Sequence, residues 1–159
     1  MKRLLFICTG NTCRSPLAEA ISRKLINQYG IDAEVKSAGV ATSNGQPMSD
    51  YAQSVLTSRG IAADSFRSSR LTAAEVEWAD VILTMTKDHK RHVMERFPQT
   101  IEKIYSLKEW ANYENNMQSW MDTDIADPYG QALTKYEQTA QEIEQALFSI
   151  LPRLQQETQ

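Results

Sequence analysis

The stretch that decides the fold is LLFICTGNTCRSPLAEAI, residues 4–21. Its first four residues are apolar and predict a strand that is buried on both faces. From Pro16 onward, apolar residues recur at helical spacing to about Tyr29. Residues 8–16 therefore form a loop that leads from a buried strand directly into a helix. The backbone N–H groups of such a loop converge at a helix N-terminus, where they favour a bound anion.

Strand and helix patterns alternate along the rest of the chain. Further strands are predicted at 33–37, at 81–85 and within 101–107, and further helices at 50–58, 72–78, 87–97, 108–113 and 132–151. This alternation is typical of a parallel sheet covered by helices on both faces. We therefore predict a single α/β domain over residues 1–157, a three-layer α/β/α fold with a four-stranded parallel sheet and a phosphate-binding loop after strand 1.

Composition and charge argue against some classes of binding partner. The net charge is −3 and no basic stretch stands out, because the most basic run, 87–92, is typical of a solvated helix face. The N-terminal apolar stretch is too short for a signal peptide or a membrane span. We predict a cytoplasmic monomer with no nucleic-acid or membrane partner. His89 and His92 do not have metal-ligand spacing, and we expect both on the surface of the helix at 87–97.

The residue types in the loop suit phosphoryl chemistry. Arg14 can clamp two phosphoryl oxygens with its planar guanidinium. Cys8, in the same positive environment, is expected to be a thiolate that attacks phosphorus in line and forms a phosphocysteine. Gly10 supplies close backbone approach and any positive φ that the loop needs. Ser15 can donate a hydrogen bond to the sulfur, and the Asn11 side chain can hold the loop in shape.

Hydrolysis also needs an acid for the leaving group and a base for water. The best candidate is Asp127, in the run Asp127-Pro128-Tyr129-Gly130. Pro128 stiffens a turn that can hold the carboxylate over the loop, and the Tyr129 ring can line the pocket. Such a run is also common in ordinary turns, and the loop at Cys8 is what favours the catalytic interpretation.

The run from Cys8 to Pro16, together with Asp127-Pro128-Tyr129, resembles the low-molecular-weight protein tyrosine phosphatase family over the whole length of the chain. The resemblance implies that Cys8 is the nucleophile, Arg14 the phosphate clamp and Asp127 the general acid and base. It assigns substrate and phosphate binding to Thr9, Gly10, Asn11, Thr12, Cys13, Ser15 and Tyr129, with Ser37 in a supporting network. It implies phosphorylated proteins as substrates, and no metal or organic cofactor.

Thr12 bears on the substrate. Tyrosine-directed members of the family usually carry a bulkier aliphatic residue at this position, whereas threonine resembles the bacterial protein-arginine phosphatase branch. The hydroxyl of Thr12 can bond a guanidinium, which a methyl group cannot. We therefore expect phosphoarginine hydrolysis, with phosphotyrosine as the alternative. Tyr129 is usual in tyrosine-directed members, and the segment 112–126 is longer than is usual in arginine phosphatases.

Other functional classes are compatible with a loop of this kind. A phosphocarrier domain also accepts phosphate on a cysteine after its first strand, and a phospho-binding module would need the loop alone. Arg14 and Asp127 argue against both. A thiol-relaying arsenate reductase would need further cysteines downstream, and none follows Cys13.

Cys8 and Cys13 are the only cysteines, and they lie in one loop. This pattern favours a reducing compartment over a structural disulfide. Cys13 could trap oxidised Cys8 as a reversible disulfide, or it could be a small buried residue. If it protects Cys8, dithiothreitol should restore peroxide-treated wild-type protein better than the Cys13→Ser variant, and equal recovery would contradict protection.

Overall fold

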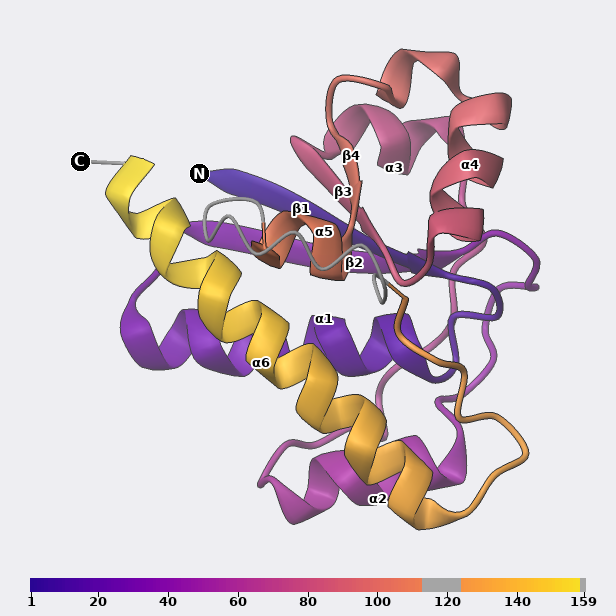
Figure 1. Ribbon diagram of the computed structural model, residues 1–159. Helices are drawn as coiled ribbons and strands as arrows, with labels where there is room; N and C mark the ends of the chain where they lie inside the picture. The colour runs from indigo at the N-terminus through magenta and orange to yellow at the C-terminus, as the bar shows by residue number, and fades with distance from the viewer. Residues whose placement is uncertain (113–123, 158–159) are drawn as a thin grey trace.

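The computed structural model describes residues 1–112 and 124–157 (Figure 1). Its centre is a four-stranded sheet in the order β2-β1-β3-β4, and all neighbouring strands are parallel. The strands are β1 (Lys2–Cys8), β2 (Ala33–Gly39), β3 (Val81–Thr84) and β4 (Ile104–Ser106). The predicted α/β fold with a four-stranded parallel sheet is confirmed.

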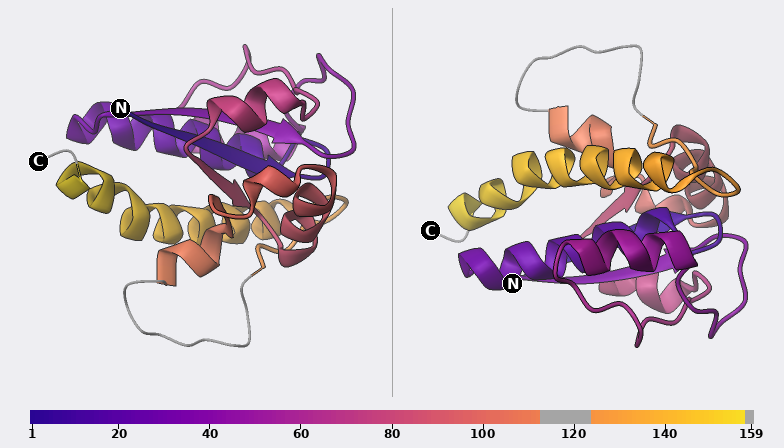
Figure 2. Two further views of the ribbon diagram at one scale, coloured as in Figure 1. Left: turned by 90° about the horizontal axis from the view of Figure 1, so that it is seen from above. Right: turned by 90° about the horizontal axis from the view of Figure 1, so that it is seen from below.

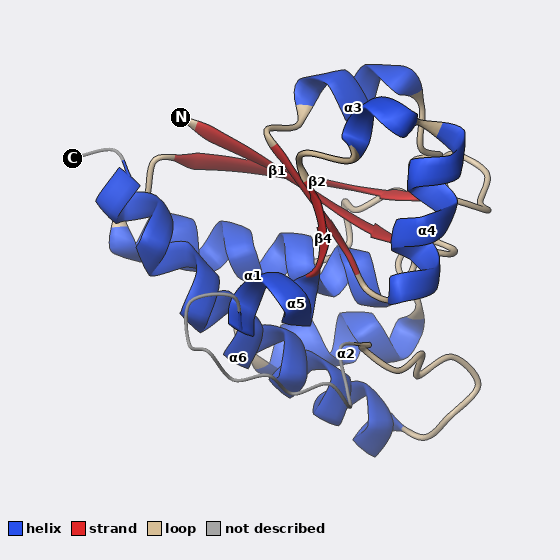
Figure 3. Ribbon diagram, turned by 45° about the horizontal axis from the view of Figure 1, so that its top comes forward, coloured by secondary structure: helices blue, strands red, loops and turns tan. Residues whose placement is uncertain are grey.

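Helices cover both faces of the sheet, and the strands lie between two helical layers (Figure 3). One layer contains α1 (Arg14–Tyr29), α2 (Asp50–Ser58), α5 (Leu107–Asn112) and α6 (Leu133–Glu157). The other contains α3 (Ala73–Trp78), α4 (Lys87–Arg96) and the short 3₁₀ turn η1 (Pro98–Thr100). The three-layer arrangement follows from right-handed crossovers between parallel strands.

Strand β1 joins the two halves of the core. Leu4 and Phe6 belong to the apolar cluster on the α1 and α6 side, whereas Leu5 and Ile7 belong to the cluster on the α3 and α4 side. All four side chains are fully buried. Alternate residues of a strand point to opposite faces, so an uninterrupted apolar run is what a central strand needs.

The helix α1 begins where the loop ends and stops at a glycine. Gly30 has a φ of 62°, and its N–H donates to the carbonyl of Ile26. Glycine directly after the last helical turn is the usual residue for such a left-handed cap.

The last helix runs further than predicted. The sequence interpretation ended it at 151, before Pro152, but α6 continues to Glu157. Pro152 is exposed, while Leu151 and Leu154 on either side of it are buried in the core. Burial of these leucines outweighs the backbone hydrogen bond that proline cannot make. Of the long segment 112–126 noted in the sequence, residues 113–123 lie outside the described residues.

The carboxyl ends of the strands gather at one end of the molecule. The N-terminus and the last turns of α6 lie at the opposite end (Figure 1, Figure 2). Ligands of parallel α/β sheets bind beyond the carboxyl ends of the strands. The loop after β1 opens at that end.

Candidate active site

The loop after β1 encloses a small pocket of about 230 Å³. The pocket is lined by Cys8, Thr9, Gly10, Thr12, Cys13, Arg14, Asp127 and Tyr129. Among the described residues, none accepts a hydrogen bond from the backbone N–H groups of Gly10, Thr12, Cys13 or Arg14. Several free donors at the start of a helix are suited to the oxygens of a tetrahedral anion.

Cys8 lines this pocket and is buried, with 3% of the residue exposed. Its Sγ accepts the backbone N–H of Asn11 at 3.3 Å and lies 2.9 Å from Oγ of Ser15. Hydrogen bonds of this kind stabilise a thiolate more than a thiol. The predicted contact between Ser15 and the sulfur is present.

The positive φ in the loop falls on Asn11, at 53°, and not on Gly10, where the sequence interpretation had allowed for it. Asparagine is among the few side-chain-bearing residues that adopt this conformation readily. The cause lies in the Asn11 side chain, which is fully buried. Its amide group donates to Oγ of Ser15 at 2.8 Å and to Oγ of Ser37 at 2.9 Å, and its carbonyl oxygen accepts the N–H of Ser69 at 2.8 Å.

The loop also packs tightly against the end of β2. A Cβ added to Gly39 would lie 2.7 Å from the carbonyl oxygen of Thr9 and 3.1 Å from Cβ of Asn11. Only glycine leaves room for the loop backbone here. Ser37 and Gly39 together therefore support the loop from the neighbouring strand.

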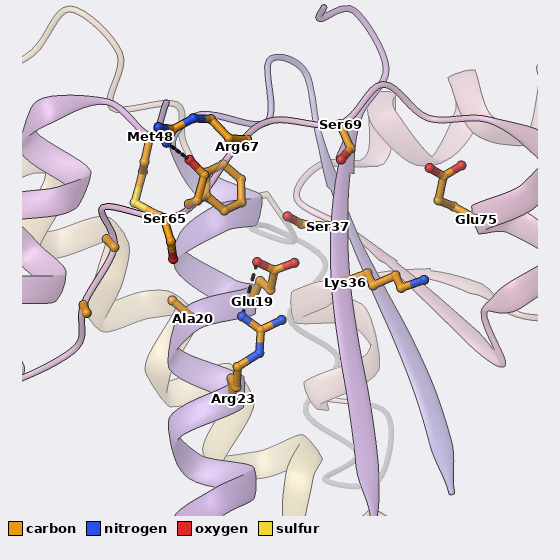
Figure 4. A pocket seen from close by; sticks show the side chains of 13 residues that line it. Glu19, Ala20, Arg23, Lys36, Ser37, Met48, Ser65, Arg67, Ser69 and Glu75 are labelled. Atoms are coloured by element: carbon orange, nitrogen blue, oxygen red, sulfur yellow. Dashed lines mark hydrogen bonds and ion pairs between the residues drawn. The ribbon is translucent and has the colours of Figure 1, made fainter. Parts of the chain in front are cut away.

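Ser37 and Ser69, which bond the side chain of Asn11, also line a second cavity of about 440 Å³ (Figure 4). In that view the carboxylate of Glu19 lies between Ser37 and Arg23. Burial raises the pKa of Glu19, against the opposing effects of Arg23 and of hydrogen bonding to Ser37. The sequence interpretation identified Ser37 but not Glu19 behind it, because Glu19 has the ordinary spacing of a helix residue.

Arg14 connects the loop to the segment that carries Asp127. The Arg14 side chain is 6% exposed. One terminal nitrogen of its guanidinium donates to the carbonyl of Ile125 at 2.9 Å, and the other lies 3.7 Å from Oδ2 of Asp127. Ile125 is itself fully buried, and its N–H donates to the carbonyl of Met85 after β3 at 2.8 Å. The structure therefore brings the predicted clamp and the predicted acid together at one pocket.

Asp127 is half exposed and has a short turn of its own. Its Oδ1 accepts the N–H of Tyr129 at 3.1 Å, while Oδ2 faces Arg14. Tyr129 lines the pocket and is 75% exposed. An Asx turn holds the carboxylate at the pocket and leaves the ring free to contact a bound group.

Thr12 and Cys13 form the side of the pocket nearest α2. The carbonyl of Thr12 accepts the N–H of Ser49 at 2.9 Å, and the thiol of Cys13 donates to Oγ of Ser49 at 3.3 Å. The Cys13 sulfur also lies 3.6 Å from the hydroxyl of Tyr136. Cys8 and Cys13 are both free thiols, and a disulfide between them stays a prediction.

His89 was placed wrongly by the sequence interpretation. It is 7% exposed, and its Nε2 lies 2.7 Å from Oγ1 of Thr9 in the loop. His92, one turn further along α4, is exposed as predicted. The sequence pattern gave no signal for this contact, because the contact depends on β3 lying beside β1 in the sheet.

Protonation of His89 should destabilise the protein. Burial, followed by the charge of Arg14, lowers the pKa of His89 from 6.5 to about 4. Between about pH 6.5 and pH 4 the unfolded chain therefore binds a proton that the folded chain does not, so stability falls as the pH falls through this range. We expect a loss of about 1–2 kcal/mol, which allows for solvent screening.

Urea unfolding of wild type and of His89→Gln across this pH range checks the prediction. Glutamine does not titrate, so the variant should lose less stability than wild type on acidification. The same pH slope in both proteins would contradict it.

Among residues 1–112 and 124–157, no helix is long and apolar enough to cross a membrane. Over the same residues, no group of three or more His, Cys, Asp or Glu side chains is arranged to hold a metal ion.

Comparisons with known proteins agree with this geometry. The family model described as low molecular weight phosphotyrosine protein phosphatase matches residues 3–159. A protein-arginine phosphatase of Geobacillus stearothermophilus is 41% identical over 98% of this chain and 97% of its own length. A solved structure of the YwlE arginine phosphatase from the same organism has a TM-score of 0.88 at 39% identity, and covers 99% of this chain and 96% of that one.

Tyrosine-directed relatives also match. A probable low molecular weight protein-tyrosine phosphatase of Ralstonia nicotianae is 31% identical over 97% of both chains. These full-length matches favour a phosphatase over the phosphocarrier and binding-module alternatives. The matches cover nearly the whole chain in sequence and in fold, and this chain therefore belongs to the low molecular weight phosphotyrosine protein phosphatase family and is a phosphatase.

Proposed function

We propose that this phosphatase hydrolyses phosphoarginine in proteins through a phosphocysteine on Cys8. The observation that supports phosphoarginine as the substrate is the position of Thr12, which lines the pocket together with Cys8 and Arg14. A hydroxyl there can accept a hydrogen bond from a guanidinium nitrogen, which an aliphatic side chain cannot do. The names of the relatives support the same substrate, because the arginine phosphatase is the more similar of those described above, at 41% against 31% identity.

Binding of the phosphoryl group falls to the loop and to Arg14. The free N–H groups of the loop and of the first turn of α1 donate to the phosphoryl oxygens. The Arg14 guanidinium is already held beside the pocket by the carbonyl of Ile125. It therefore needs little reorganisation to contact an oxygen at the pocket mouth.

Transfer then runs in two steps. The thiolate of Cys8 attacks phosphorus in line, the P–N bond breaks, and the carboxyl of Asp127 supplies a proton to the leaving guanidine nitrogen. In the second step, the Asp127 carboxylate takes a proton from water, which attacks phosphorus and releases inorganic phosphate. The hydroxyl of Ser15, 2.9 Å from Sγ, stabilises the thiolate as it leaves.

Replacing Thr12 by isoleucine should reduce the preference for phosphoarginine. We expect kcat/KM for a phosphoarginine peptide to fall by about tenfold, the equivalent of one hydrogen bond, while a matched phosphotyrosine peptide is affected less. The measurement is kcat/KM on both peptides for wild type, for Thr12→Ile and for Thr12→Ser, which keeps the hydroxyl. Equal losses on both peptides would show that Thr12 does not select the substrate.

Phosphotyrosine is the second candidate substrate. Tyr129, at the pocket rim, could stack on an aryl ring, and the same chemistry would cleave a P–O bond. A wild-type preference for the phosphotyrosine peptide would establish this alternative and overturn the proposed substrate.

The partners proposed here are phosphorylated proteins, without nucleic acid or membrane, and the protein is proposed to act as a monomer in the cytoplasm. Sedimentation at working concentration tests the oligomeric state, and a stable dimer would contradict it.

A further inference from the structure

The first residue after the nucleophile is tied to a buried imidazole. Oγ1 of Thr9 lies 2.7 Å from Nε2 of His89, and His89 is 7% exposed. The imidazole belongs to the first turn of α4, where the backbone N–H of His89 donates to Oγ1 of Thr86 at 3.1 Å. His89 is therefore fixed by the helix start, and Thr9 is its contact with the loop.

The position of the ring proton follows from the burial of His89. With a pKa of about 4 the ring is neutral at pH 7 and has a single N–H group. Among the described residues, Nδ1 is buried and has no hydrogen-bond partner. A buried N–H without an acceptor is rarer in proteins than a buried acceptor without a donor. The proton therefore belongs on Nε2, from which it is donated to Oγ1 of Thr9.

This assignment leaves the hydroxyl proton of Thr9 free. A threonine hydroxyl has one proton and two lone pairs, and His89 occupies a lone pair. Thr9 is exposed, and it lines the same pocket as Cys8 and Arg14. An acceptor that enters this pocket is thus offered an additional donor beside the backbone N–H groups.

We propose that the Thr9 hydroxyl donates a hydrogen bond to an oxygen of the bound phosphoryl group, and that His89 is the positioning residue that holds it in the donor orientation. The inference rests on the phosphoryl-binding role proposed for the loop, and is independent of whether the substrate is phosphoarginine or phosphotyrosine. It gives His89 a part in the reaction through Thr9, without contact to the substrate.

The direct test compares Thr9→Val, which removes the hydroxyl at similar shape, with Thr9→Ser, which keeps it. The probes are inorganic phosphate as a competitive inhibitor and an aryl phosphate as substrate. For Thr9→Val we expect the inhibition constant of phosphate to rise about tenfold and kcat/KM to fall about tenfold. Thr9→Ser should stay within about threefold of wild type in both. An inhibition constant of Thr9→Val within about twofold of wild type would overturn the proposal.

A second series tests the positioning role. His89→Leu removes the donor, whereas the side-chain amide of His89→Gln can still donate to Thr9. We expect His89→Leu to raise the inhibition constant as Thr9→Val does, His89→Gln to restore most of it, and the double variant to be no worse than Thr9→Val alone. Additive losses in the double variant would show that His89 does not act through Thr9. If His89→Leu does not fold, the glutamine variant and the two Thr9 variants still decide the question.

The outcome can be separated from a failure of the proposed function. If Cys8→Ser retains turnover, the phosphoryl-transfer role of the loop is wrong and the Thr9 inference falls with it. If Cys8→Ser is inactive but Thr9→Val binds phosphate as wild type does, only the inference about Thr9 and His89 is overturned.

Discussion

The Cys8→Ser variant should release phosphate from an aryl phosphate at least about 10⁴-fold more slowly than wild type. The sulfur of Cys8 accepts the N–H of Asn11 and contacts Oγ of Ser15, an environment that stabilises a thiolate. A serine hydroxyl in the same place stays protonated at neutral pH and is a much poorer nucleophile. The expected loss is in kcat, because the donors that bind the phosphoryl group are unchanged.

Two controls accompany this prediction. The variant should unfold at nearly the wild-type temperature, since one buried atom is exchanged for a smaller one. It should also bind inorganic phosphate within about threefold of wild type, because the loop N–H groups and Arg14 supply that affinity. Turnover above about one hundredth of the wild-type rate would rule out Cys8 as the nucleophile.

The Asp127→Asn variant should lose about 10²- to 10⁴-fold in kcat on substrates whose leaving group needs a proton. The carboxylate lies 3.7 Å from Arg14 at the pocket, held by the turn to Tyr129, so asparagine should keep the position and remove the proton. An activated aryl phosphate needs little help at its leaving group. On such a substrate, the substitution should therefore slow the step that breaks the bond to the leaving group much less.

Asp124 offers a matched control on the same segment. Its Oδ1 accepts the backbone N–H of Lys87 at the start of α4, an interaction that an asparagine oxygen preserves. Asp124→Asn should therefore stay within about threefold of wild type. A comparable loss in both variants would mean that the charge of the segment matters, and not the proton of Asp127.

The part of the site closest to β1 could be predicted from the sequence for a physical reason. An apolar run, a Gly-Asn loop and a helix in this order predict a central strand that leads directly into a helix. Cys8 and Arg14 then lie at the carboxyl end of the parallel strands, where ligands bind. Asp127 was a candidate because hydrolysis needs an acid and the Asp127-Pro128 turn can hold one, and the family resemblance assigned it that role. Asp127 is far from the loop in sequence, and the buried Ile125 holds its segment at the site. The N–H of Ile125 donates to the carbonyl of Met85, and its carbonyl accepts from Arg14.

Other features were beyond a sequence pattern. Both Gly10 and Asn11 tolerate a positive φ, and only the three hydrogen bonds of the buried Asn11 side chain decide between them. His89 stands in a charged run, so its polarity suggested solvent, although helix geometry turns it toward Thr9. Pro152 suggested that α6 ends at residue 151, but the helix continues because Leu151 and Leu154 are buried in the core.

The most direct test of the account is to follow the phosphoryl group itself. A protein substrate phosphorylated on arginine with labelled phosphate is mixed with excess enzyme, quenched within one turnover and digested, and the labelled peptide is identified. We expect label on the peptide that contains Cys8, followed by its release as inorganic phosphate, and no labelled cysteine in Cys8→Ser. Release of phosphate from phosphoarginine without label on Cys8 at any time, or no transfer from phosphoarginine at all, would contradict the proposed mechanism.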